Sequence, residues 1–183
     1  MDVYRIDVSV RSSARVEQVV ARLDPAQALD RLVFLCHGWR DGVQFGLKSD
    51  TDDRRARLAA FATKLVAAST DNLAVTLYCC STGASPDDPS GEGGFADALR
   101  DALVAAGRPR VRVFAHSRSG HTTRTAAIRF FDGGVVTGGV DPVPRGTPEY
   151  RRLDARFDDR ADTLRFRVPY LTTEELLAEL RAT

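Results

Sequence analysis

A histidine and a cysteine that could act together follow two separate apolar segments of the chain. His37 and Gly38 come directly after 31–36 (RLVFLC), and Cys80 comes directly after 73–79 (LAVTLYC). A thiol attacks a carbonyl as its thiolate, and a nearby imidazole can take the thiol proton and later protonate the leaving amine. The backbone N–H groups of Gly38 and Cys80 would suit an oxyanion hole, because glycine lets a substrate approach the main chain closely. These residue types predict Cys80 as nucleophile and His37 as its acid and base.

For this pair to meet, the two apolar segments must be neighbouring strands of one sheet. Segments rich in Val, Leu and Phe predict strands, and apolar residues at three- and four-residue spacing predict helices between them. The predicted strands cover 3–10, 31–36, 73–79 and 110–116, and the predicted helices cover 14–23, 53–68 and 95–106. Neighbouring strands lie about 4.8 Å apart. We therefore expect His37 and Cys80 to face one cleft at the carboxyl edge of the sheet.

The alternation of strands and helices favours an α/β fold. Crossovers from strand to helix to strand bring successive strands parallel, so we predict a mostly parallel central sheet with helices on its faces.

The chain has 183 residues, of which 43% are apolar, and this suits one domain over 1–183. Three further elements are predicted after residue 120: a strand over 122–131 that turns into a hairpin at 132–136, a charged surface helix within 150–167, and a last helix capped by Thr172 and Glu175.

The segments LVFLCHG and VTLYCCSTG resemble those of the caspase-like cysteine peptidases. In that family one apolar strand leads into His-Gly, and a later one leads into a small residue followed by the catalytic Cys. The 43 residues from His37 to Cys80 are similar to the family spacing, although Cys79 stands where alanine or serine is usual. The resemblance, which covers residues 31–125, implies a three-layer fold with helices on both faces of the sheet. It also implies an endopeptidase that forms an acyl-thioester and requires no cofactor.

Four other residues are candidates for contacts with a peptide substrate. By analogy with caspases, Arg124 would bind an acidic P1 side chain through a bidentate contact. Asp41, close to the histidine, would instead suit a basic P1 side chain, as in metacaspases, so both preferences stay open. Ser117 and His121 lie in the same loop as Arg124 and are expected to contact the substrate.

Charge and cysteine spacing argue against several other classes of protein. Lys and Arg number 26 against 25 Asp and Glu, so the sequence shows no basic footprint for nucleic acid or an anionic membrane. Three cysteines without C-x-x-C spacing argue against a disulfide framework and against a metal site, and we interpret Cys36 and Cys79 as packing residues. No stretch has the length of a membrane span, and residues 1–10 lack the apolar run of a signal peptide. We expect a cytoplasmic protein that acts on a protein or peptide.

Two alternatives stay open beside the cysteine peptidase. Ser117 lies in 115–119 (AHSRS), a relaxed form of the nucleophile elbow of α/β-hydrolases. That fold requires a histidine later in the chain, and His121 lies only four residues away in the same loop, which leaves the serine without a suitable base. The other alternative is an inactive caspase-like interaction module. The presence of both His37 and Cys80 argues against it.

Overall fold

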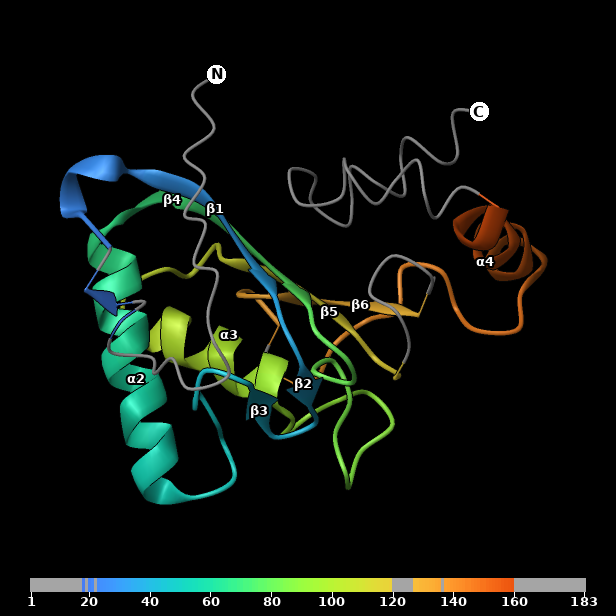
Figure 1. The fold of residues 1–183 in the computed structure, drawn as a ribbon, viewed down its shortest axis with the longest axis horizontal. Coiled ribbons are helices and arrows are strands. Elements are labelled where there is room, and N and C mark those ends of the chain that lie inside the picture. Colours follow the sequence, from blue (N-terminus) through green and yellow to red (C-terminus); the bar gives the residue numbers. More distant parts are fainter. Residues whose placement is uncertain (1–17, 19, 22, 120–126, 136, 160–183) are drawn as a thin grey trace.

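The larger of two sheets carries the segments that the sequence places around the site. A computed structural model describes residues 18, 20–21, 23–119, 127–135 and 137–159, and in these residues four strands follow the order β1, β4, β5, β6 (Figure 1). β1, β4 and β5 are parallel, and β6 is antiparallel to β5. Their bounds are Leu29–Leu35 for β1, Ser69–Tyr78 for β4, Arg112–His116 for β5 and Ile128–Asp132 for β6. The predicted α/β class with a mostly parallel sheet is therefore confirmed.

β1 and β4 are the neighbours that the dyad requires. Their register runs without interruption from Arg31 opposite Ala74 to Leu35 opposite Tyr78. β4 lies inside the sheet, and its apolar run of Leu, Ala, Val and Tyr suits a parallel strand that is buried on both faces, whereas β1 lies at the edge and is only partly buried. The two strands consequently end level with each other at the carboxyl edge of the sheet.

Two helices cover one face of this sheet. α2 (Asp52–Ala67) and α3 (Phe95–Ala105) match the predicted helices 53–68 and 95–106 to within one residue at each end. The Thr51 side chain caps α2 by accepting a hydrogen bond from the Arg54 N–H at 3.4 Å. The apolar stripes of both helices pack with alternate residues of the sheet in one core, where each fully buried Leu or Phe contributes about 1.5–3 kcal/mol. The members that β4 and β5 give to this core include Leu73, Val75, Leu77, Val113 and Ala115.

The opposite face of the sheet is buried as well. Tyr78 and Phe114 alternate with the core residues of their strands and are almost fully shielded from solvent. The Tyr78 ring lies 5.9 Å from the His116 ring, and Phe114 stacks on Phe130 at 5.0 Å between centroids. The central strands are thus buried on both faces, as the apolar runs in the sequence predict.

The remaining elements are short or lie at the edges. They are the 3₁₀ helix η1 (Pro25–Gln27), the antiparallel hairpin of β2 (Gly38–Trp39) and β3 (Gly42–Val43), and the helix α4 (Pro148–Asp159). α4 begins the charged helix that the sequence predicts within 150–167, two residues earlier than expected. The predicted strand 3–10, the capping box of Thr172 and Glu175, and most of the predicted helix 14–23 lie outside the described residues.

Candidate active site

The loops that carry His37 and Cys80 leave the sheet side by side. One residue beyond the last paired positions of β1 and β4, the Sγ atoms of Cys36 and Cys79 lie 3.4 Å apart. Gly38 packs directly on the chain after β4, since a Cβ atom there would lie 2.6 Å from the Cys79 Cβ and 3.0 Å from the Cys80 carbonyl oxygen. Any side chain at position 38 would push the two loops apart. The structure therefore brings the two segments of the predicted dyad together.

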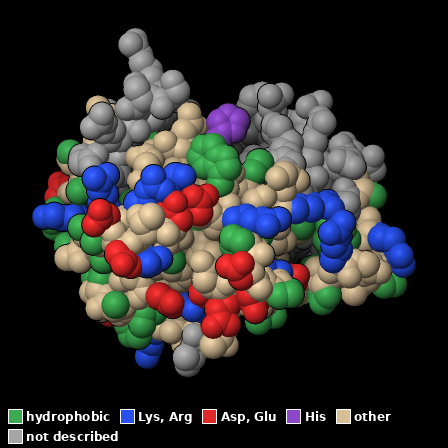
Figure 2. Space-filling view, turned by 90° about the horizontal axis from the view of Figure 1, so that it is seen from below, with side chains coloured by type: hydrophobic (Ala, Val, Ile, Leu, Met, Phe, Trp, Pro, Cys, Tyr) green, Lys and Arg blue, Asp and Glu red, His purple; other side chains and the backbone are tan. Residues whose placement is uncertain are grey.

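Cys79 and Cys80 differ sharply in their access to solvent. Cys79 has no exposed surface, whereas Cys80 is half-buried and His37 is exposed. Figure 2 shows a histidine side chain at the rim of one face of the molecule, beside a hydrophobic patch, and acidic and basic side chains intermingled over the middle of that face. Of the two adjacent thiols, Cys80 is the one that is partly accessible to solvent.

A tight turn follows Cys80 and fixes it against β5. Ser81 adopts a positive φ of 58°, in the left-handed region that a residue with a side chain enters at a cost of about 1–2 kcal/mol. The Thr82 hydroxyl donates to the Cys79 carbonyl at 3.0 Å, and the Gly83 N–H donates to the His116 carbonyl at 2.8 Å. The strand thus ends abruptly, and Cys80 stands at the corner of the turn.

The N-terminus of α3 joins the histidine loop to the cysteine loop. The Phe95 N–H donates to the Arg40 carbonyl at 2.8 Å, and the Ala96 N–H donates to the Thr82 carbonyl at 3.0 Å. The first N–H groups of a helix have no partner within the helix and carry its positive partial charge. Here they bind one carbonyl from each loop, so α3 holds both loops in place from the side of the core.

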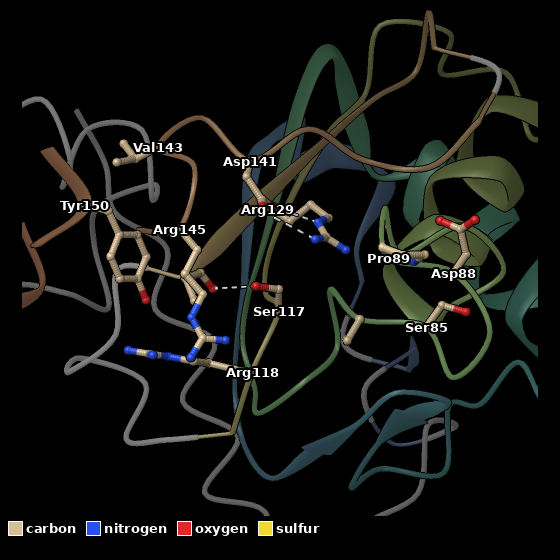
Figure 3. A pocket seen from close by; sticks show the side chains of 12 residues that line it. Ser85, Asp88, Pro89, Ser117, Arg118, Arg129, Asp141, Val143, Arg145 and Tyr150 are labelled. Atoms are coloured by element: carbon tan, nitrogen blue, oxygen red, sulfur yellow. Dashed lines mark hydrogen bonds and ion pairs between the residues drawn. The ribbon is translucent and has the colours of Figure 1, made fainter. Parts of the chain in front are cut away.

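A cavity of about 230 Å³ opens beside the turn that follows Cys80 (Figure 3). Ala84 and Ser85, at the end of that turn, form one wall, and the loop after β5 forms another. The lining combines apolar side chains with three arginines and two aspartates. The lining residues are Ala84, Ser85, Asp88, Pro89, Ser117, Arg118, Ala127, Arg129, Asp141, Val143, Arg145 and Tyr150.

Arg129 connects this cavity to the cysteine turn. Its buried guanidinium donates to the two carboxylate oxygens of Asp141 at 2.8 and 3.4 Å and to the Gly83 carbonyl at 3.1 Å. A buried guanidinium with both an acidic partner and a carbonyl is well compensated for its lost hydration. The sequence analysis did not identify Arg129 as functional, although a charged residue inside the apolar run 126–131 was a visible signal.

Arg118, Arg145 and Tyr150 stand together at the other side of the cavity. The Arg118 guanidinium lies over the Tyr150 ring, 5.7 Å from its centroid, and the Arg145 side chain extends beside it (Figure 3). Ser117, one of the residues predicted to contact a substrate, also lines the cavity, and its hydroxyl donates to the Ala127 carbonyl at 3.3 Å. This bond engages the hydroxyl with the main chain rather than with a base, which does not favour a serine nucleophile.

Asp41, another predicted substrate contact, does not line this cavity. Asp41 pairs with Lys48 at 3.0 Å in the β2–β3 hairpin, where Lys48 also lies over the Trp39 ring. Its charge is therefore already compensated. His121 and Arg124 lie outside the described residues.

The pKa values of the Cys36 and Cys79 thiols are shifted in opposite directions by neighbouring groups. The hydrogen bond with Cys79 lowers the pKa of Cys36, whereas the hydrogen bond with Cys36 and burial together raise the pKa of Cys79 well above its usual range. Of the two, Cys36 is the thiol that ionises more readily.

Comparison with protein-family models, with curated proteins and with solved structures found no match. Within the described ranges, no helix has the length and apolarity to cross a membrane, and no three His, Cys, Asp or Glu side chains gather as a metal site would require. The function is therefore inferred from the geometry of the site.

The close packing at Gly38 gives a direct test of the junction. Gly38→Ala places a methyl group against Cys79 and Thr82, so we expect it to lower the free energy of unfolding by about 1–3 kcal/mol. The matched control is Gly134→Ala, where the nearest atom to the new methyl group lies 3.6 Å away and the expected change is within about 0.5 kcal/mol. Urea unfolding of both variants measures the difference. Equal stability of the two variants would contradict the close contact.

Proposed function

We propose that the protein is a caspase-like cysteine endopeptidase in which Cys80 is the nucleophile and His37 transfers the protons. The observation that carries this proposal is that β1 and β4 end at the same position of the sheet, with Leu35 opposite Tyr78. It places the chain segments that hold the exposed His37 and the half-buried Cys80 side by side, although the two residues lie 43 positions apart in the sequence. The fixed turn after Cys80 adds support, because a nucleophile held in one position avoids the entropic cost of orienting it for each attack.

The chemistry follows from the arrangement of the two loops. His37 takes the thiol proton of Cys80, and the thiolate adds to the peptide carbonyl carbon to give a tetrahedral oxyanion. The N–H groups of Gly38 and Cys80 would stabilise this oxyanion, and each donor of this kind is typically worth about 100- to 1000-fold in rate. The C–N bond then breaks, the imidazolium protonates the leaving amine, and a thioester remains on Cys80. Water, deprotonated by His37, hydrolyses the thioester and restores the thiol.

A three-layer fold, as in caspase-like peptidases, is part of the same proposal. α2 and α3 form one layer on the sheet, and the burial of Tyr78 and Phe114 on the opposite face is what a sheet covered on both sides requires.

The arginines of the cavity favour a substrate with an acidic side chain over a basic one. The lining holds three arginines against two aspartates, an excess of one positive charge, and Asp141 already binds Arg129. A guanidinium binds a carboxylate through two parallel hydrogen bonds, and it does so more strongly where water is partly excluded. Asp41, the candidate for a basic substrate, is occupied by Lys48.

Loss of turnover on removal of either dyad residue tests the proposed mechanism. The test uses peptides from a library that the native protein cleaves. For these peptides, Cys80→Ala should reduce kcat/KM by at least about 1000-fold, because the covalent step is lost. We expect His37→Ala to reduce kcat/KM by about 100- to 10,000-fold, which is the usual contribution of general acid–base catalysis. Cys36→Ala is the control, since its thiol takes no part in the proposed steps. Unchanged turnover in Cys80→Ala would contradict the mechanism, and peptide binding without any cleavage would favour the interaction module.

Charge reversal in the cavity tests the preference for an acidic substrate. Arg145→Glu should reduce kcat/KM for peptides with an acidic side chain by about 10- to 100-fold, which corresponds to the loss of one charged hydrogen bond. Peptides with a neutral side chain at the same position should change little. Arg151→Glu, an exposed arginine on α4 outside the cavity lining, supplies the same change of charge as a control. If Arg145→Glu lowered kcat/KM equally for acidic and neutral peptides, the cavity would not be the site that selects acidic substrates.

A further inference from the structure

Cys36 and Cys79 form a pair of thiols that the proposed catalytic steps do not use. Their Sγ atoms lie 3.4 Å apart, and the Cys79 thiol also lies 3.6 Å from the Phe34 carbonyl oxygen. We propose that Cys36 and Cys79 are a site of reversible oxidation and form an intramolecular disulfide on exposure to hydrogen peroxide. This inference stands apart from the proposed peptidase activity, because it depends only on the contact between the two thiols.

The position of the two residues suits a disulfide. They follow the paired residues Leu35 and Tyr78 directly, on neighbouring parallel strands. Such strands lie about 4.8 Å apart, which falls within the span of about 4.4–6.8 Å between Cα atoms that a disulfide bridges. The sulfurs would have to approach one another by about 1.4 Å to reach the length of an S–S bond. Rotation about the two Cα–Cβ bonds can supply most of this movement without separating the strands.

Unequal access gives the two thiols different roles. Cys36 is partly exposed and meets the oxidant first, and its lowered pKa provides more of the reactive thiolate. Cys79 is fully buried behind it, so its thiol is shielded from direct attack but lies in contact with the Cys36 sulfur. This combination of an accessible thiol and an adjacent second thiol is typical of redox-sensing cysteines.

The oxidation proceeds in two balanced steps. The Cys36 thiolate attacks one peroxide oxygen, so that an S–O bond forms, the O–O bond breaks and hydroxide leaves. The Cys79 sulfur then attacks the sulfur of the Cys36 sulfenic acid, so that the S–S bond forms, the S–O bond breaks and a second hydroxide leaves. The two thiol protons convert both hydroxides to water. Overall the thiols lose two electrons and two protons, and one peroxide is reduced to two waters.

The resulting cross-link would sit one residue before both members of the proposed dyad. It would tie β1 to β4 at the point where the histidine and cysteine loops diverge. Cys80 lies beyond Cys79, at the corner of the turn, and outside the contact between the two sulfurs. The proposal therefore predicts a defined pairing that spares Cys80.

Peptide mapping of the oxidised protein tests this pairing. The folded Cys80→Ala variant, which lacks the competing thiol, is treated with a limiting amount of hydrogen peroxide, alkylated and digested with trypsin. We expect peptide 32–40, which holds Cys36, to be joined to peptide 65–100, which holds Cys79, and to be released by dithiothreitol. In the wild type, the same treatment should give the same linked peptides. Cys36→Ala, a change at the partly exposed member of the pair, should abolish the link.

Three results would overturn the proposal. One is free, alkylated Cys36 and Cys79 after peroxide treatment of folded Cys80→Ala. The second is a wild-type disulfide within peptide 65–100, which would join Cys79 to Cys80. The third is a linked pair of peptides that persists in folded Cys79→Ala, which would join Cys36 to Cys80. Circular dichroism of each variant before oxidation establishes that the fold is intact.

Discussion

The parallel pairing of β1 with β4 is the interaction on which the rest of the site depends. Their register holds Leu35 opposite Tyr78, so the residues that follow leave the sheet at the same level. Successive side chains of a strand alternate between faces, and a slip of one residue would exchange the buried and reachable positions after β4. The register thus decides that Cys79 is enclosed and Cys80 accessible. Strong burial on both faces of β4 stabilises this register, because any slip would carry polar residues into the core.

Main-chain hydrogen bonds hold the loops that follow β1 and β4 in fixed positions. The N-terminus of α3 binds Arg40 from the histidine loop and Thr82 from the cysteine loop, and the Gly83 N–H binds the end of β5. Arg129 extends this framework to the cavity through the Gly83 carbonyl and Asp141. The turn that follows Cys80 and the cavity are therefore parts of one hydrogen-bonded unit. That unit would connect the proposed nucleophile to the charge that would select its substrate.

The sequence predicts the elements with strong apolar periodicity and misses what depends on pairing. The helices 53–68 and 95–106 are found within one residue, because their stripes of Leu, Ala and Phe specify both period and length. β4 begins at Ser69 rather than at residue 73, because Ser69 pairs with Leu29 across a break in the register and the polar residues 69–72 carry no apolar pattern. The antiparallel direction of β6 also cannot be predicted from its own residues, because it depends on how the strand pairs with β5. The cavity brings Arg118, Arg129, Asp141 and Tyr150 together from separate segments, so only the tertiary structure reveals it.

Site-resolved alkylation tests the central claim, that the junction of β1 and β4 makes Cys80 a histidine-assisted nucleophile. A limiting electrophile is added between about pH 5 and 9, and the label on each cysteine is measured in the wild type and in His37→Ala. The proposed dyad predicts that Cys80 is labelled first and that the pH dependence of its rate changes when the imidazole is removed. Equal, slow labelling of Cys36, Cys79 and Cys80, or a Cys80 profile that is the same in both proteins, would contradict the claim.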